Sequence, residues 1–189
     1  MSTGVKRFVV LTALIAAACC SSGQVVDFNS NRDFQVDLDR LVRDQTGNPL
    51  VGTNYLAQLY YGRSVDSLQA VTAGPARFRA PTTSVPGTWA GGNRTLQGFT
   101  ASEFATLQVR VWDSAVGASW EEAQSSGFGV TQHGVSAPFI FQIAPAGCAN
   151  PFCFLMENLR GFTLVPEPSA AALFGAGALA LLVVRLRAR

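Results

Sequence analysis

The chain has 189 residues, of which 48% are hydrophobic, and its formal net charge is +2 at pH 7. This length suits one domain with a substantial core rather than two. The positive charge comes from the two ends, because residues 24–165 contain nine Arg and no Lys against seven Asp and four Glu. A slightly acidic middle argues against nucleic-acid binding, which needs a basic surface.

Residues 1–23 have the layout of a secretory signal peptide. The basic residues Lys6 and Arg7 precede an apolar run over residues 8–18, and the alanines that end this run suit a signal-peptidase cut. We expect cleavage between Ala18 and Gly23. The chain is therefore predicted to be exported, with signal peptidase as its first processing partner.

The four cysteines form two pairs with different expected fates. Cys19 or Cys20 would be the lipid-modified cysteine of a lipoprotein, an alternative that the small Ala16 disfavours but leaves open. Cys148 and Cys153 stay in the exported chain, on either side of an Asn-Pro turn, and the export route is oxidising. We predict a disulfide between them, because a metal site needs more ligands and a redox site is usually Cys-x-x-Cys.

Short runs that alternate apolar and polar residues predict β-strands along residues 24–164. The clearest covers residues 104–112, where Leu107, Val109 and Val111 share one face and Trp112 lies on the other. We expect residues 67–72 to pair with the strand at 55–61. The predicted strands are residues 25–29, 34–38, 55–61, 67–72, 104–112, 139–143 and 160–165.

Two stretches are predicted to lie outside this strand pattern. Residues 73–98 are rich in Gly, Pro and Thr and are predicted to form a long surface excursion, with 77–79 as its only strand fragment. Residues 119–125 predict a short helix with Glu121 and Glu122 in its first turn. The sum is an all-β fold, an antiparallel β-sandwich of jelly-roll or immunoglobulin-like topology, flanked by a signal helix and a C-terminal transmembrane helix.

Few residues suit catalysis, and we predict a non-enzymatic protein without a cofactor. His133 is the only histidine and lies in a predicted loop, and the two exported cysteines are expected to be bridged. A secreted hydrolase is a third hypothesis, and it requires two carboxylates across a cleft. The available acids are Glu103, Asp113, Glu121, Glu122 and Glu157.

Five aspartates close together raise the question of a calcium site. They lack a glycine-centred ligand loop and alternate with Arg32, Arg40 and Arg43, so we predict a solvated face of mixed charge and no metal. The aspartates are Asp27, Asp33, Asp37, Asp39 and Asp44.

Three tryptophans support an alternative function as a glycan-binding module of the cell surface. Trp89, Trp112 and Trp120 would stack on sugars if they lined an exposed face. Trp112 would instead belong to the core if the sheet is covered on both sides.

Residues 165–189 combine three unlike elements in a fixed order. Pro166-Glu167-Pro168 comes first, a run without ionisable groups over residues 169–184 follows, and arginines end the chain. At ~1.5 Å per residue the run makes a helix of roughly 24 Å, slightly shorter than the ~30 Å hydrocarbon core of a membrane. Arginine clusters stay in the cytoplasm, which leaves the rest of the chain outside. The expected anchor residues are Ser169, Phe174, Leu182, Val184, Arg185, Arg187 and Arg189.

These terminal residues resemble a PEP-CTERM sorting signal, which many otherwise unrelated exported proteins of exopolysaccharide-producing Gram-negative bacteria carry. The resemblance covers only about the last 25 residues. It implies processing by an exosortase, a membrane-embedded protease or transpeptidase, with Pro166, Glu167 and Pro168 as its recognition sequence. A buried helix of a soluble domain and a plain tail anchor are the alternatives for residues 169–184.

The resemblance also implies a location and partners. The precursor would be anchored in the inner membrane, and the mature form would lie at the cell surface or in the extracellular matrix. Exopolysaccharide is a further candidate partner there. A looser resemblance of the strands around residues 55–60 and 108–113 to small PEP-CTERM-domain proteins carries no activity with it.

Overall fold

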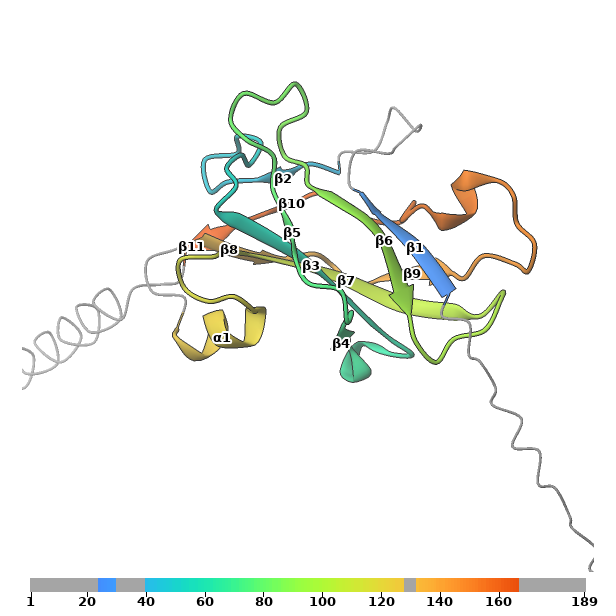
Figure 1. Cartoon of the computed structure of the whole chain (residues 1–189). Coiled ribbons are helices and arrows are strands. Elements are labelled where there is room, and N and C mark those ends of the chain that lie inside the picture. Colours follow the sequence, from blue (N-terminus) through green and yellow to red (C-terminus); the bar gives the residue numbers. More distant parts are fainter. Residues whose placement is uncertain (1–23, 30–39, 128–131, 167–189) are drawn as a thin grey trace, which may run out of the picture.

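The structure is a computed structural model that describes residues 24–29, 40–127 and 132–166 (Figure 1). Within these ranges the chain is all-β, as predicted, and its helices are α1 Trp120–Ser125, η1 Val65–Ser67 and η2 Pro151–Phe154. The predicted signal helix, the strand at 34–38 and the transmembrane helix at 169–184 lie outside the described residues. The strands are β1 Gln24–Asn29, β2 Val42–Arg43, β3 Tyr55–Gly62, β4 Gln69–Ala70, β5 Ala76–Arg77, β6 Ala90–Leu96, β7 Phe104–Asp113, β8 Gln132–Val135, β9 Phe139–Gln142, β10 Phe162–Thr163 and β11 Val165–Pro166.

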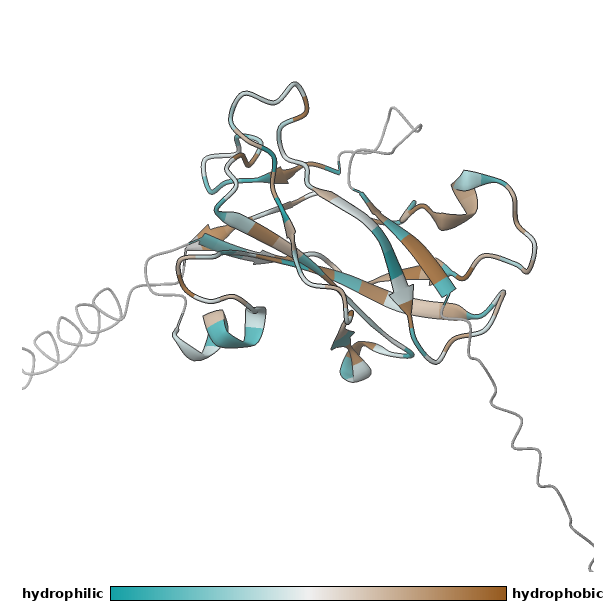
Figure 2. Cartoon of the chain, in the orientation of Figure 1, coloured by the Kyte–Doolittle hydropathy of each residue, from teal (hydrophilic) through white to brown (hydrophobic). Residues whose placement is uncertain are grey.

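The main sheet is built on the antiparallel pair β3 and β7. Their register runs from Tyr55 opposite Asp113 to Gly62 opposite Thr106. The strand order is β11-β8-β7-β3-β4, with β5 also paired to β3 and β9 also paired to β7. Alternation of apolar and polar residues along β3 and β7 gives the sheet two distinct faces (Figure 2). The predicted pairing of residues 67–72 with β3 is confirmed by β4.

Both faces of the main sheet are covered. On one face the antiparallel pair β1 and β6 packs over the sheet, and α1 lies against the other face (Figure 1). The larger core fills the first interface with fully buried side chains, including Val26 and Phe28 from β1 and Leu59 and Val109 from the sheet. Each such side chain stabilises the fold by about 1.5 to 3 kcal/mol of apolar burial. The buried apolar side chains of this first interface therefore hold the β1 and β6 pair against the main sheet.

Helix α1 forms as predicted and closes the second face. The hydroxyl of Ser119 accepts a hydrogen bond from the Glu122 amide at 3.2 Å and caps the helix. Glu121 and Glu122 in the first turn suit the positive end of the helix dipole. Trp120 and Ala123 point inward and join a smaller apolar cluster with Leu56, Tyr60 and Trp112.

The prediction of a surface excursion over residues 73–98 is wrong, although its expected strand fragment at 77–79 overlaps β5 and the bridge at Phe78. This stretch contains β5 and β6, and Phe78 pairs with Trp89 in an isolated bridge between them. β6 is mostly exposed and hydrogen-bonds to β1 along its length, so backbone pairing defines it, with Leu96 its single buried side chain. The prediction missed this strand because its Gly, Asn and Arg residues show no alternation of apolar and polar side chains.

Three smaller predictions also need correction. His133 lies in strand β8 rather than in a loop, opposite Trp112 of β7. The strand expected at 160–165 divides into β10, which pairs in parallel with β2, and β11, which pairs with β8. Arg40 is not on a solvated face, because it is 7% exposed and donates from Nη1 to the carbonyl of Met156 at 2.9 Å.

Candidate functional site

The proposed processing motif begins inside the described fold. Pro166 is the last residue of β11 and pairs with Gln132 at one edge of the main sheet. Val165 beside it is 54% exposed. Glu167, Pro168 and the expected anchor residues from Ser169 to Arg189 lie outside the described residues. Among the residues that are described, none belongs to a helix long and apolar enough to cross a membrane.

The predicted disulfide is confirmed. Cys148 and Cys153 are joined with an S–S distance of 2.00 Å. Asn150 caps the start of the η2 helix, which contains Cys153, because its side-chain oxygen accepts from the Phe152 amide at 3.0 Å. The bridge and this cap hold the loop after β9 in a defined shape.

The three tryptophans do not form a sugar-stacking platform. Trp89 and Trp112 are fully buried and Trp120 is 5% exposed. Trp89 lies in the larger core, whereas Trp112 and Trp120 pack edge to face between the sheet and α1. The expectation that Trp112 belongs to the core of a sheet covered on both sides is confirmed. An exposed row of indoles, which the glycan-binding alternative required, is absent because all three rings are used in packing.

The second face carries a stacked polar cluster. The guanidinium of Arg110 lies 3.9 Å from the ring centre of Tyr60 and 5.5 Å from that of Trp120. The Tyr60 hydroxyl donates to the Glu121 carboxylate at 2.6 Å. Burial, followed by this hydrogen bond, raises the pKa of Tyr60 above its ordinary value. The cluster thus ties α1 to the sheet by charge and stacking.

We expect the Tyr60→Phe variant to lose about 1 to 2 kcal/mol of unfolding free energy at neutral pH, because a hydrogen bond to a charged acceptor is removed. A tyrosine with a raised folded pKa adds stability below its unfolded pKa of about 10 and loses it at higher pH. Urea denaturation between pH 9 and pH 11 (about one unit to either side of that pKa) should therefore show a steeper alkaline loss of unfolding free energy for the natural chain than for the variant. Equal stability and equal pH dependence would contradict this role.

The candidate carboxylates are engaged in separate structural roles. Glu121 bonds Tyr60, Asp113 accepts from Asn54 at 3.0 Å, and Glu103 accepts from the Thr100 amide at 2.7 Å. Two cavities in the described part of the chain contain one carboxylate each. Glu157 lines the larger cavity, and Asp27 lines a second cavity that also touches Pro151.

The aspartate-rich stretch gives no metal site within the described residues. Asp27 is buried, and Asp44 accepts from the amides of Thr46 and Asn48, each at 2.9 Å. Hydrogen bonding from the Thr46 side chain lowers the pKa of Asp44. Asp33, Asp37 and Asp39 lie outside the described residues. No group of three or more His, Cys, Asp or Glu side chains gathers in the described part of the chain.

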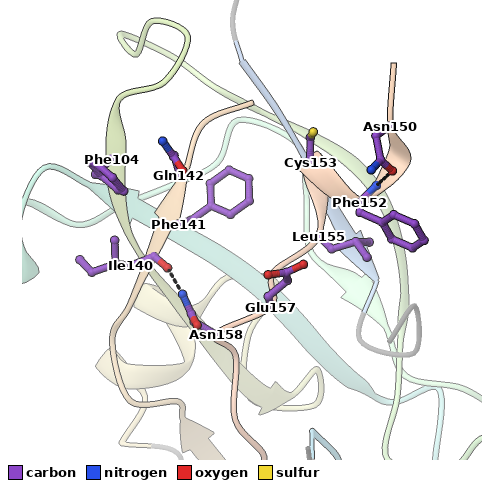
Figure 3. A pocket seen from close by; sticks show the side chains of 10 residues that line it. All are labelled: Phe104, Ile140, Phe141, Gln142, Asn150, Phe152, Cys153, Leu155, Glu157 and Asn158. Carbon is purple, nitrogen blue, oxygen red and sulfur yellow. Dashed lines mark hydrogen bonds between the residues drawn. The ribbon is translucent and has the colours of Figure 1, made fainter. Parts of the chain in front are cut away.

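A groove that the strand pattern did not predict lies between β9 and the disulfide loop (Figure 3). It has a volume of about 440 Å³. Phe141 points from β9 toward the loop, and Asn158 bridges the two sides by donating to the Ile140 carbonyl at 2.8 Å. The lining residues are Phe104, Ile140, Phe141, Gln142, Asn150, Phe152, Cys153, Leu155, Glu157 and Asn158.

Exposed apolar side chains mark this groove. Phe104 is 60% exposed and Ile140 is 52% exposed, and they lie on the sheet face opposite to the larger core. The sequence contained a signal for them, because both fall on the side of their strands that alternates away from buried residues. Phe152 joins them from the loop, and no pattern in the sequence placed it there.

Comparison of this chain with protein-family models, with curated proteins and with solved structures finds no match.

Proposed function

We propose that this chain is an exported, non-enzymatic β-sandwich protein that its C-terminal segment holds in the inner membrane. An exosortase-like enzyme then processes it for the cell surface or the extracellular matrix, in association with exopolysaccharide. The observation that carries the proposal is the sequence of three unlike elements at residues 166–189: Pro166-Glu167-Pro168, the uncharged apolar run at 169–184, and Arg185, Arg187 and Arg189.

Two features of the fold support this reading. β11 brings the chain to an edge of the main sheet at Pro166, so the motif continues directly from an edge strand and not from the interior. The disulfide between Cys148 and Cys153 suits an oxidising compartment outside the cytoplasm. The packing of the β1 and β6 pair against the main sheet supports the sandwich architecture.

The motif can be tested in an exosortase-bearing bacterium that exports the full chain. Intact mass of the protein from envelope and medium should show a mature form without residues 1–18 and without Arg189. We expect Glu167→Ala to reduce this processed form at least about tenfold, as expected when a recognised polar group is removed from a substrate. Deletion of the exosortase gene should have the same effect.

Glu157→Ala is the matched control, because it removes an acid upstream of the motif and should leave the mature mass pattern unchanged apart from the substitution. A natural mature protein that retains Arg189, or equal processing of Glu167→Ala, would overturn the proposal.

A further inference from the structure

We propose that the outer edge of β9 and the groove beside it bind an extended polypeptide segment of a partner protein. The segment has alternating apolar and polar residues and a lysine or arginine facing Glu157. This inference goes beyond surface delivery and does not depend on how the chain is exported or processed.

The backbone of β9 is paired on one side. β9 runs antiparallel to β7, from Gln142 opposite Phe104 to Phe139 opposite Leu107, and within the described residues no strand pairs with its other side. The Ile143 amide donates to the Glu103 carbonyl at 2.8 Å, which fixes the alternation of the ladder. The backbone groups of Phe139 and Phe141 therefore point to β7, and those of Ile140 and Gln142 point outward.

The hydrogen bond from Asn158 to the Ile140 carbonyl agrees with this direction, because it comes from the outer side. Three outward groups then remain: the amides of Ile140 and Gln142 and the carbonyl of Gln142. No partner for them occurs among the described residues. Edge strands are usually protected by charges, proline or bulges, and the sequence of β9, Phe-Ile-Phe-Gln, has none of these. A bound strand would satisfy all three groups.

The far wall of the groove is preformed. The disulfide closes the loop that forms this wall, and Arg40 holds the segment after it by donating to the Met156 carbonyl. The wall stands beside β9 in Figure 3 and leaves a volume of about 440 Å³ between them. A single extended segment fits such a slot, whereas the edge of another folded sheet would meet the wall. This geometry favours a peptide strand over a second copy of the chain.

The lining specifies the chemistry of the segment. Ile140 and Phe104 offer apolar surface on one side of the edge, which suits apolar side chains at alternate positions. Glu157 is the one ionisable residue among those that line the groove. A cation at one position of the bound segment would complement it.

The probe is a dye-labelled, end-blocked peptide in which valine alternates with threonine and one central position is arginine. We expect saturable binding to the full-length protein in detergent micelles, followed by fluorescence anisotropy. Bound peptide should slow hydrogen exchange at the amides of Ile140 and Gln142. The same peptide N-methylated along one edge should not bind, because it cannot form the ladder.

Three variants distinguish strand pairing from nonspecific apolar binding of the peptide. Gln142→Pro removes an outward amide that β7 does not use, and should weaken binding at least about tenfold, while Gln142→Ala keeps the amide and should bind normally. Glu157→Gln should weaken the binding of the arginine peptide by about two- to fivefold, as for the loss of an exposed ion pair. The same substitution should not change the binding of a peptide that has glutamine in place of arginine.

Equal binding of the N-methylated peptide, or normal binding to Gln142→Pro, would overturn the proposal. Absence of saturable binding would do the same. Self-association that Gln142→Pro abolishes, without peptide binding, would assign the edge to a second copy and also overturn it. The N-methylated peptide keeps the test decisive if Gln142→Pro does not fold.

Discussion

We expect the Trp89→Ala variant to lose about 3 to 5 kcal/mol of unfolding free energy, the range measured for large buried aromatic side chains. Trp89 is fully buried, and its ring centre lies 5.2 Å from that of Phe28 and 5.5 Å from that of Phe78. These rings belong to β1 and to the segment between β5 and β6. Removing the indole would therefore open a cavity where the smaller sheet is held to the rest of the fold.

Urea denaturation of the full-length protein, followed by circular dichroism, measures this loss as a lower midpoint. Val65→Ala is the matched control, because Val65 is 54% exposed and its truncation should change stability by less than about 0.5 kcal/mol. A loss below about 1 kcal/mol for Trp89→Ala would mean that the site collapses around the missing ring.

The Gly91→Ala variant should be destabilised by at least about 2 kcal/mol, because an added methyl group overpacks a close contact. Gly91 lies in β6 directly against β1, and a Cβ atom there would overlap the carbonyl oxygen and the ring of Phe28. The Gly91 amide also donates to the Asn29 side-chain oxygen at 3.0 Å. Accommodation of the methyl group would require β1 to move away and break this contact.

Gly74→Ala is the control for the glycine substitution itself. No heavy atom lies within 4 Å of the Cβ position at Gly74, and its backbone is not in the left-handed region. That variant should be neutral or slightly stabilised, since alanine restricts the unfolded chain. Thermal unfolding measures the stability of both variants. An equal loss of stability in Gly91→Ala and Gly74→Ala would contradict the role of close packing at Gly91.

Regular alternation is the part of this fold that the sequence predicts well. Along β7 the buried Leu107, Val109 and Val111 and the polar residues between them require one apolar face, and only a strand provides it. The same reasoning finds β3 and the start of β9. Helix α1 is found at residues 119–125 through the two glutamates in its first turn, whereas the capping role of Ser119 comes from the structure.

β6 shows why other strands are missed. A strand defined by backbone pairing with β1 needs no apolar alternation, and the partner residues Asn93 and Arg94 look like loop residues in isolation. The strand position of His133 is missed for the same reason. Gly134, next to it in β8, allows Phe162 and Leu164 to pack closely over this strand, and that packing is known only from the structure. These contacts join residues about 30 positions apart, which a local pattern does not contain.

The groove was missed for a related reason. Phe104 and Ile140 are visible as exposed positions only when the register of β7 and β9 is known. The far wall comes from the disulfide loop, whose pairing was predicted but whose position against β9 depends on Arg40 and Asn158. By contrast, the proposed sorting motif is a linear pattern in the sequence, and it stays a prediction.

The short strand at the end of the described fold determines how the domain responds to tension. Any pull that arrives through residue 167 acts first on β11, which is two residues long. Pro166 has no amide hydrogen, so Val165 supplies the only N–H of this strand. β3 and β7, in contrast, share a ladder along all eight residues of β3. Under load β11 would therefore separate from β8 at a smaller force than the separation of β3 from β7 requires. The chain would then lengthen by the residues of β11 before the core is disturbed.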